Sequence, residues 1–276
     1  MNKQPSADVL DAFGCAEDPV RLEGGKGETW RAGDIVLKPV EFAPETRWRA
    51  AALAEVAESA EFRIARPLQA RDGEWIAGTS VGQNSSGGHP SLGWEASRLV
   101  PGRPDTSRPD DAIRAGIAFH QAIAHLPRPD FLDFRTDPWA IGDRVAWAEL
   151  PPEGTAPARD LLRPLLDARR PVELAAQAVH GDLPGNVLFA PGQPPAVIDW
   201  AVYWRPPAWA AAVAVADALC WYGATPGLID RWAHLPEWQQ MLVRALVYRI
   251  VTHDISGFWT PDQIAAYQPA VEAVLS

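Results

Sequence analysis

The 276-residue sequence has few cysteines, few lysines and no long apolar run, and each scarcity excludes a class of protein. The 2 cysteines, Cys15 and Cys220, lie far apart, so they indicate neither a disulfide framework nor a zinc site, and we expect two free thiols. No apolar stretch approaches the roughly 18 residues of a membrane-spanning helix, and the first residues lack the apolar centre of a signal peptide. We therefore expect a cytoplasmic protein with no membrane partner.

Positive charge is also in short supply. The sequence has 25 Lys and Arg against 35 Asp and Glu, a formal net charge of −10. Nucleic acids bind basic surfaces, so this balance argues against a nucleic-acid partner. Lysine occurs only at Lys3, Lys26 and Lys38, so nearly all of the positive charge is arginine, a bias common in proteins from GC-rich genomes. This scarcity draws attention to Lys38.

Hydrophobic residues are abundant, at 47% of the chain, and charged residues make up 22%. This is the composition of a chain that folds by itself. The first 100 residues have the pattern of a small antiparallel sheet with one helix. Residue types and turn signals predict strands near 19–22, 35–39, 73–77 and 93–99, and a helix over 44–59. A glycine cluster, Gly24, Gly25 and Gly27, falls between the first two strands. It is typical either of an ordinary hairpin turn or of a loop whose backbone approaches phosphate oxygens.

The composition changes near residues 100–105, where proline, glycine and charge replace apolar alternation. Beyond this point the pattern is mostly helical, with helices expected over 110–126, 141–150 and 158–169 and again in the last seventy residues. We therefore divide the chain into residues 1–100 and residues 101–276.

Three polar residues follow one another closely in the second part: Asp182, Asn186 and Asp199. Between the last two, the apolar runs 187–189 and 196–198 flank a proline- and glycine-rich turn, a pattern that predicts a hairpin. A hairpin brings its ends together, so Asn186 and Asp199 can hold one cation between them with Asp182 within reach. Phosphoryl transfer needs this set of groups, because magnesium neutralises the moving charge while a carboxylate orients the acceptor hydroxyl.

The motif His180-Gly181-Asp182-Leu183-Pro184-Gly185-Asn186, with Val197-Ile198-Asp199-Trp200, resembles the paired motifs of the aminoglycoside phosphotransferase and choline kinase families. The resemblance implies a bacterial kinase with an α+β, two-lobed protein-kinase-like fold: a small antiparallel N-terminal lobe and a mostly helical C-terminal lobe. It further implies that Asp182 is the catalytic carboxylate, that Asn186 and Asp199 bind magnesium, and that His180 is a scaffold residue. The family usually has four residues between Asp182 and Asn186, whereas three intervene here.

The same resemblance assigns the nucleotide-binding residues. It implies that residues 1–100 bind ATP or GTP and that residues 101–276 carry out catalysis and bind the acceptor. Lys38 pairs with the nucleotide phosphates, and Glu55 orients Lys38, with Glu45 and Glu58 as less favoured candidates. A backbone hinge over residues 97–102, which includes Ser97 and Leu99, holds the adenine edge. Asp217 lies in an apolar helical stretch, where a carboxylate needs a partner, and the resemblance makes it a support of the catalytic loop.

The function these features favour is an ATP- and magnesium-dependent phosphotransferase. Its acceptor is a hydroxyl of a small polar molecule: an amino sugar, aminoglycoside, sugar or amino alcohol. One alternative is a hydrolase in which His180, Asp182 and Asp199 hold a transition metal. A second is a catalytically silent kinase-like protein that binds a nucleotide or a partner. Asp254 and Glu237 are acidic residues that could line a cationic acceptor site, although the sequence does not place them there.

Overall fold

The computed structural model describes residues 4–23, 27–78, 92–257 and 259–276. The chain divides into two compact units, Met1–Gly102 and Arg103–Ser276, a division two residues later than the change in composition suggested. Cys15 and Cys220 are free thiols, as expected. Within the described residues, no helix is both long enough and apolar enough to cross a membrane.

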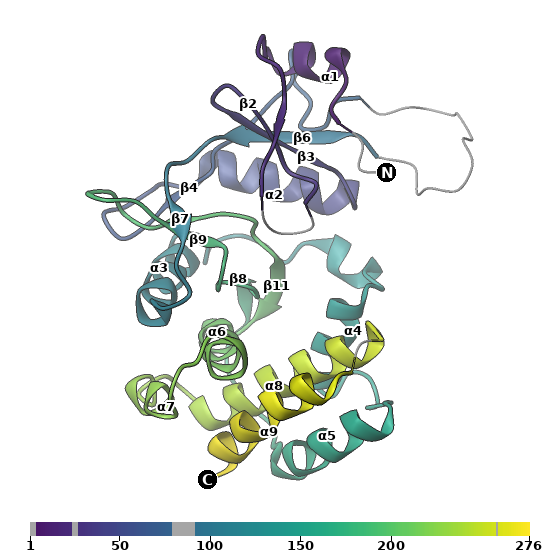
Figure 1. Cartoon of the computed structure of the whole chain (residues 1–276), viewed down its shortest axis with the longest axis vertical. Helices are drawn as coiled ribbons and strands as arrows, with labels where there is room; N and C mark the ends of the chain where they lie inside the picture. The colour runs from purple at the N-terminus through teal and green to yellow at the C-terminus, as the bar shows by residue number, and fades with distance from the viewer. Residues whose placement is uncertain (1–3, 24–26, 79–91, 258) are drawn as a thin grey trace. The chain divides into compact units, whose positions relative to one another are not determined.

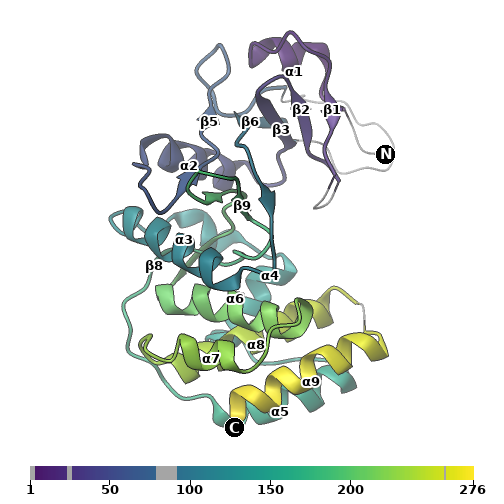
Figure 2. The same cartoon turned by 60° about the vertical axis from the view of Figure 1, so that its left-hand side comes forward.

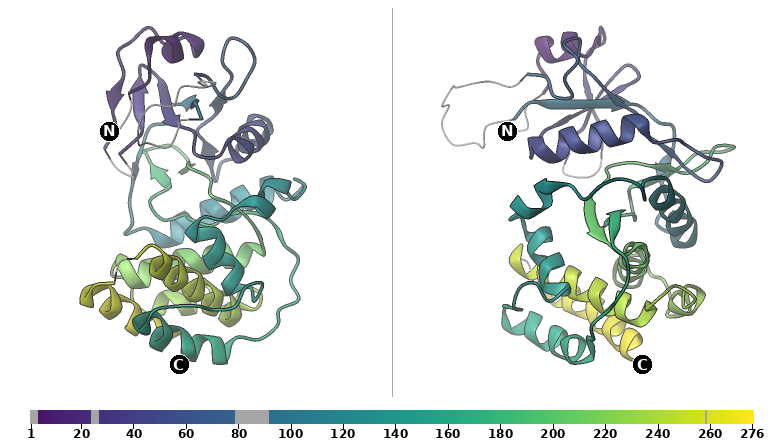
Figure 3. Two further views of the ribbon diagram at one scale, coloured as in Figure 1. Left: turned by 90° about the vertical axis from the view of Figure 1, so that its right-hand side faces the viewer. Right: turned by 180° about the vertical axis from the view of Figure 1, so that it is seen from behind.

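The first unit is built on an antiparallel sheet (Figure 1), whose strands lie in the order β1-β2-β3-β6-β5 (Figure 2). These strands are β1 (Val20–Arg21), β2 (Trp30–Ala32), β3 (Ile35–Pro39), β5 (Pro67–Leu68) and β6 (Trp94–Arg98). Helix α2 (Ala43–Glu55) runs along the sheet (Figure 3) and starts with Pro44 in its first turn, where proline suits a helix. The short helix α1 (Ala7–Ala12) packs Val9 against the core that contains Leu37 and Trp94.

One strand of this unit differs from the prediction. The strand expected over 73–77 reduces to a single bridge between Ala77 and Trp94. Gly73 adopts a φ of +85°, so the chain turns there instead of extending. The short strands β4 (Arg63–Ile64) and β5 were not predicted from the sequence. A two-residue strand has too short an alternation to give a recognisable sequence pattern.

The second unit is a helical body around α8 (Trp238–Ile255), an 18-residue helix in which most side chains are buried. Helix α6 (Pro207–Trp221) lies beside α8 (Figures 1 and 2), and its buried residues are mostly alanine and valine, which let the two axes come close. The remaining α-helices of this unit are α3 (Pro109–Ala122), α4 (Pro138–Ala146), α5 (Ala156–Ala168), α7 (Gly227–Arg231) and α9 (Pro261–Leu275), with a 3-10 turn at Asp130–Phe134.

Two small groups of strands in this unit position the motif that contains Asp182, Asn186 and Asp199. Strands β7 (Arg103–Pro104), β9 (Val187–Phe189) and β10 (Ala196–Val197) pair antiparallel in the order β7-β9-β10. Strand β8 (Gln177–His180) pairs with β11 (Val202–Arg205). The predicted hairpin is therefore present, and the chain between β8 and β9 forms the loop from Gly181 to Asn186.

Candidate active site

The loop from Gly181 to Asn186 is anchored by His180, a fully buried residue at the end of β8. Its Nδ1 accepts the Asp182 N–H at 3.1 Å, and its Nε2 lies 3.0 Å from the Ile198 carbonyl oxygen. Because Nδ1 accepts, the ring proton belongs on Nε2, which donates to Ile198. One neutral imidazole thus ties the backbone at Asp182 to the end of β10.

Behind it lies His120 of α3, whose Nε2 accepts the His180 N–H at 2.9 Å. Burial, together with the neighbouring His180, lowers the pKa of His120 to about 3. His120 is therefore uncharged at neutral pH, as an acceptor at Nε2 requires. Gly181 completes the packing, because a Cβ at this position would lie 2.4 Å from the Tyr203 ring.

The shortened segment between Asp182 and Asn186 is closed by a tight turn. The Asn186 N–H donates to the Leu183 carbonyl at 3.0 Å, with Pro184 and Gly185 at the two central positions. Gly185 has a φ of +82°, and this order of proline and then glycine is the signature of a type II turn. Three residues are therefore enough to return the chain to Asp182.

The turn places the Asn186 side chain against Asp182. The amide Nδ2 donates to the Asp182 carbonyl at 2.7 Å and to Asp182 Oδ2 at 3.1 Å. With the amide nitrogen used in this way, the amide oxygen remains for a cation, and this orientation follows from the hydrogen-bond network. The one-residue deletion keeps the two side chains in contact.

Asp199 lies just past the other end of the hairpin. Val197 pairs with Val187, and the Ile198 N–H donates to the Asn186 carbonyl at 2.9 Å, so Asn186 and Asp199 flank the same end of the ladder. Asp199 is exposed and has a φ of +51°, a conformation that costs free energy for a residue with a Cβ. A carboxylate and an amide oxygen are hard ligands, so these two residues fit a magnesium ion.

Arg249 of α8 is a site residue that the sequence did not single out. Its Nη2 donates to Asp182 Oδ1 at 2.6 Å and to Asp217 Oδ2 at 2.5 Å, and its Nε donates to Asp217 Oδ1 at 2.8 Å. The guanidinium therefore joins the two aspartates. The signal was present in part, because an aspartate in the apolar helix around Asp217 requires a cationic partner.

Burial and the neighbouring charges together determine the ionisation of Arg249 and Asp217. Burial raises the pKa of Asp217, and the adjacent Arg249 opposes that rise. Burial lowers the pKa of Arg249, but the carboxylate of Asp217 and its other neighbours raise it well above the ordinary arginine value. Arg249 thus stays positively charged at any physiological pH. Asp217 is therefore linked to Asp182 through Arg249.

An open pocket of about 420 Å³ lies against this group within the second unit. Asp182, Asp217 and Arg249 form one part of its lining, and Trp221, Tyr222 and Tyr267 form an aromatic part. Trp221 and Tyr222 are 40% and 41% exposed, which is unusual for such large side chains. This volume is in the range of small-molecule sites.

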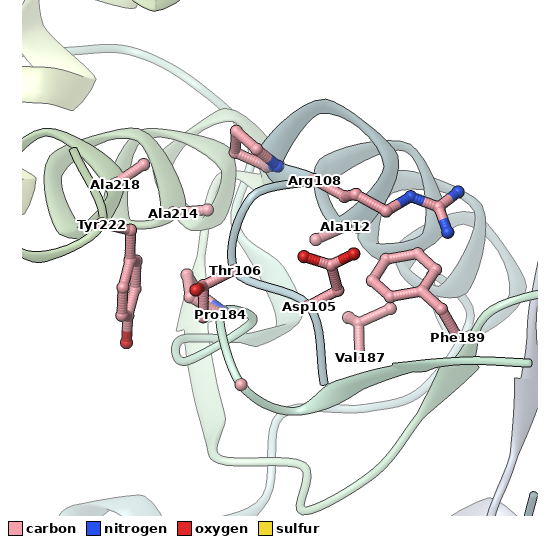
Figure 4. Close-up of a pocket in the computed structure, with 12 residues that line it drawn as sticks. Asp105, Thr106, Arg108, Ala112, Pro184, Val187, Phe189, Ala214, Ala218 and Tyr222 are labelled. Carbon is pink, nitrogen blue, oxygen red and sulfur yellow. The ribbon is translucent and has the colours of Figure 1, made fainter. Parts of the chain in front are cut away.

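A second recess, on the Pro184 side of the loop, is much smaller. Its volume is about 10 Å³, enough for roughly one water molecule. Figure 4 shows the Arg108 guanidinium over the Phe189 ring, at 4.0 Å from its centroid, and Asp105 beside them. Tyr222 lines both spaces. The recess is too small for an acceptor.

In the first unit, Lys38 lies on β3 directly across from Glu95 of β6. Glu95 in turn accepts from Nη2 of Arg49 on α2, at 2.7 and 2.8 Å to its two oxygens. Side chains directly opposite on antiparallel strands are near neighbours, so Lys38, Glu95 and Arg49 form a charged group on one face of the sheet. Neither Glu95 nor Arg49 was predicted to take part.

The other predicted nucleotide-binding residues are placed as follows. Gly24 and Gly25 lie outside the described residues, while Gly27 has a φ of +67° and its carbonyl accepts from Arg21 at 2.5 Å. Glu55 is the last residue of α2 and is exposed, whereas Glu45 is half-buried in the first turn of that helix. Glu58 accepts the Ile64 N–H at 2.9 Å.

The predicted hinge begins at the end of β6. Ser97 pairs with Val36 and Pro67 inside the sheet. The Leu99 N–H donates to the Asp34 carbonyl at 2.8 Å, so only the Leu99 carbonyl remains for the adenine edge. The backbone groups of residues 100–102 come next in the chain and complete the predicted hinge.

The geometry argues against a transition-metal hydrolase. Both ring nitrogens of His180 are used by the backbone, so neither can bind a metal. Over the part of the chain that the structure describes, no three His, Cys, Asp or Glu side chains gather as metal ligands do.

Comparison with known proteins identifies the family of the chain. The model of a family described as the phosphotransferase enzyme family matches residues 26–243. No curated protein sequence matches the chain.

Solved structures give the fold. An aminoglycoside phosphotransferase from Alicyclobacillus acidocaldarius is similar with a TM-score of 0.61 and 18% identity, over 100% of this chain and 95% of that one. A microcompartment-associated aminopropanol kinase is similar with a TM-score of 0.61 and 12% identity, over 97% of this chain and 93% of that one. Spectinomycin phosphotransferase, in complex with ADP and spectinomycin, is similar with a TM-score of 0.60 and 12% identity, over 97% of this chain and 95% of that one. The α+β protein-kinase-like fold is thereby confirmed.

Proposed function

The chain belongs to the phosphotransferase enzyme family and is a small-molecule kinase, and from this premise we propose that it transfers the γ-phosphoryl group of ATP to a hydroxyl of a small polar molecule. The observation that carries the proposal is the support around Asp182. His180 holds its backbone, while Asn186 and Arg249 hold its two carboxylate oxygens. Such a pre-positioned carboxylate suits an acceptor hydroxyl.

In the proposed reaction the acceptor oxygen bonds to the γ-phosphorus as the bond from that phosphorus to the β–γ bridging oxygen breaks. The acceptor proton goes to Asp182 and then to solvent, and the other product is ADP. Each oxygen of an ionised carboxylate accepts more than one hydrogen bond, so Asp182 can receive the hydroxyl while Arg249 and Asn186 stay in place. The Asp182 side chain is 44% exposed, which gives the acceptor access.

Magnesium, when bound, would neutralise the phosphate charge, and Asn186 and Asp199 are the residues that would hold it. The Asn186 amide is oriented for this task by its hydrogen bonds to Asp182. His180 fixes the separation of Asn186 and Asp199. It hydrogen-bonds the Asp182 backbone, to which Asn186 is bonded, and the carbonyl of Ile198, which precedes Asp199.

The first unit would supply the nucleotide-binding groups. We propose that Lys38 binds the phosphates, that the glycines Gly24, Gly25 and Gly27 approach them, and that Ser97 and Leu99 belong to the adenine hinge. Glu55 stays the predicted partner of Lys38, and Glu95 is a second carboxylate beside it. The ADP bound to spectinomycin phosphotransferase supports the use of an adenine nucleotide.

The proposal is tested by a coupled assay of ADP release with ATP, Mg²⁺ and amino sugars, aminoglycosides, sugars and amino alcohols. Acceptor-dependent ADP release is expected, with a new phosphate monoester visible by ³¹P NMR. Asp199→Ala should raise the Mg²⁺ concentration for half-maximal rate about 10-fold or more. Binding of ATP with Mg²⁺ but no transfer to any acceptor would favour the catalytically silent alternative.

A further inference from the structure

The pocket beside Asp182 has little negative charge to offer an acceptor. Of the described residues that line it, only Asp182 and Asp217 are acidic, and Arg249 lies between them. Two carboxylates and one guanidinium give a net charge of −1. A polycationic acceptor would need several carboxylates in the same place.

Both carboxylates are also already bonded. The two oxygens of Asp217 accept from Nε and Nη2 of Arg249, and Asp217 is only 7% exposed. Asp182 accepts from Arg249 and Asn186. An ammonium group in this pocket would therefore have to share Asp182 with Arg249 and Asn186, and it would find no second accessible carboxylate among the described lining residues.

The acidic residues that the sequence offered for a cationic site lie elsewhere. Asp254 accepts from the Trp259 indole at 2.7 Å and from the Thr155 N–H at 3.1 Å, and it does not line the pocket. Glu237 is exposed at the N-cap of α8, twelve residues before Arg249, or about 18 Å along the helix at 1.5 Å per residue.

What the pocket offers in place of charge is aromatic surface. Trp221 packs edge-on against Tyr267, with ring centroids 5.2 Å apart, and lies nearly parallel to His253 at 6.2 Å. These contacts hold the Trp221 ring in place although it is 40% exposed. Burial and the nearby Asp217 raise the pKa of Tyr222, so its phenol stays a neutral hydrogen-bonding group. A fixed, exposed indole suits the C–H face of a sugar ring.

We propose that the acceptor is an uncharged polyhydroxylated ring, a sugar or a cyclitol, that stacks on Trp221 and directs one hydroxyl to Asp182. The inference rests on the proposed function and narrows its acceptor class. Amino sugars and aminoglycosides are the less favoured acceptors, because their ammonium groups find no unbonded carboxylate among the described lining residues.

Matched acceptors test this directly with the full chain, ATP and Mg²⁺. The pairs share a ring and differ in one amine: glucose with glucosamine, galactose with galactosamine, and myo-inositol with an aminocyclitol, with kanamycin added as a polycation. We expect the highest kcat/KM for a neutral member, at least about 10-fold above its amine. Transfer only to amines, or better transfer to the amine in each productive pair, overturns the inference and leaves the phosphotransferase intact. No transfer to any of these compounds overturns the inference, and it overturns the phosphotransferase as well if amino alcohols are not phosphorylated either.

The stacking role has its own pair of variants. Trp221→Ala should raise KM for the best neutral acceptor about 10-fold, the change expected from the loss of one aromatic contact. KM for ATP should stay unchanged. Trp139→Ala is the matched control, because Trp139 of α4 is 39% exposed and does not line the pocket. An unchanged acceptor KM in Trp221→Ala, or an equal rise in both variants, contradicts the role given to Trp221.

Discussion

Nη2 of Arg249 lies 2.6 Å from Oδ1 of Asp182, so the proposed catalytic carboxylate is held by a cation from a helix 67 residues further along the chain. Because the same guanidinium holds Asp217, the position of Asp182 depends on a three-residue ion network in which Arg249 and Asp217 are largely buried and Asp182 is partly exposed. Such a network is costly to break at one member and much less costly to remove entirely.

Arg249→Leu should therefore destabilise the protein by about 3 to 5 kcal/mol in urea unfolding, because it leaves Asp217 buried without a partner. The double variant Arg249→Leu/Asp217→Leu should recover much of that loss. If the double variant is no more stable than the single one, the two residues do not form the coupled pair described.

Arg249→Lys separates the catalytic role from the structural one. Lysine keeps the charge but lacks the planar fork that reaches both aspartates, so we expect kcat to fall about 10-fold with little change in KM for ATP. Full kcat in a folded Arg249→Lys variant would show that positioning of Asp182 does not need the guanidinium.

Gly185 offers a test of the shortened loop. Gly185→Ala forces a residue with a Cβ into a φ of +82° and should cost about 1 kcal/mol of stability. Gly192→Ala is the matched control, since Gly192 has a φ of +70° and both sites have open space around the added Cβ. Only Gly185→Ala should raise the Mg²⁺ requirement of transfer, because only it shifts Asn186. Equal Mg²⁺ titrations for the two variants would contradict this.

His120 predicts a dependence of stability on pH. Its pKa is about 3 in the folded protein, against about 6.5 for an unperturbed histidine, so protonation favours the unfolded chain. The contribution of His120 to the free energy of unfolding is therefore fully present above pH 6.5 and is lost as the pH drops toward 3. Between pH 7 and pH 5 this residue alone should lower the free energy of unfolding by about 2 kcal/mol. His120→Gln keeps an acceptor for the His180 N–H and should flatten the profile over this range. An unchanged slope would exclude His120 as its source.

Lys38 is the test of the nucleotide-binding unit. Lys38→Met removes a charge-assisted contact with phosphate and should weaken binding of a fluorescent ATP analogue about 10- to 100-fold. Arg47→Met is the control, since Arg47 is an exposed cation on the neighbouring helix α2. Equal affinities in the two variants would remove Lys38 from the nucleotide site.

The sequence predicted the features that depend on local pattern. The hairpin of β9 and β10 was visible as two apolar runs around a turn, and helices α3, α4 and α5 have a clear 3.6-residue periodicity. The paired motif predicted Asp182, Asn186 and Asp199 as one group, and the structure places Asn186 against Asp182. These features need only a few neighbouring residues to be recognised.

What the sequence did not predict depends on contacts between distant segments. Arg249 reaches Asp182 only because α8 packs beside α6, and Glu95 meets Lys38 through strand pairing. The aromatic side of the pocket requires Trp221 and Tyr267 from two different helices. No local periodicity specifies such tertiary neighbours.

The most direct test of the account is the rate of phosphate transfer in Asp182→Asn, measured with the best acceptor and saturating ATP. Asp160→Asn, at an exposed position on α5, is the control for loss of one negative charge. We predict a fall of about 10²- to 10⁴-fold for Asp182→Asn alone, with its unfolding midpoint and ATP affinity near those of the unaltered protein. A folded Asp182→Asn variant that keeps its full rate would contradict the assignment of Asp182 as the catalytic carboxylate.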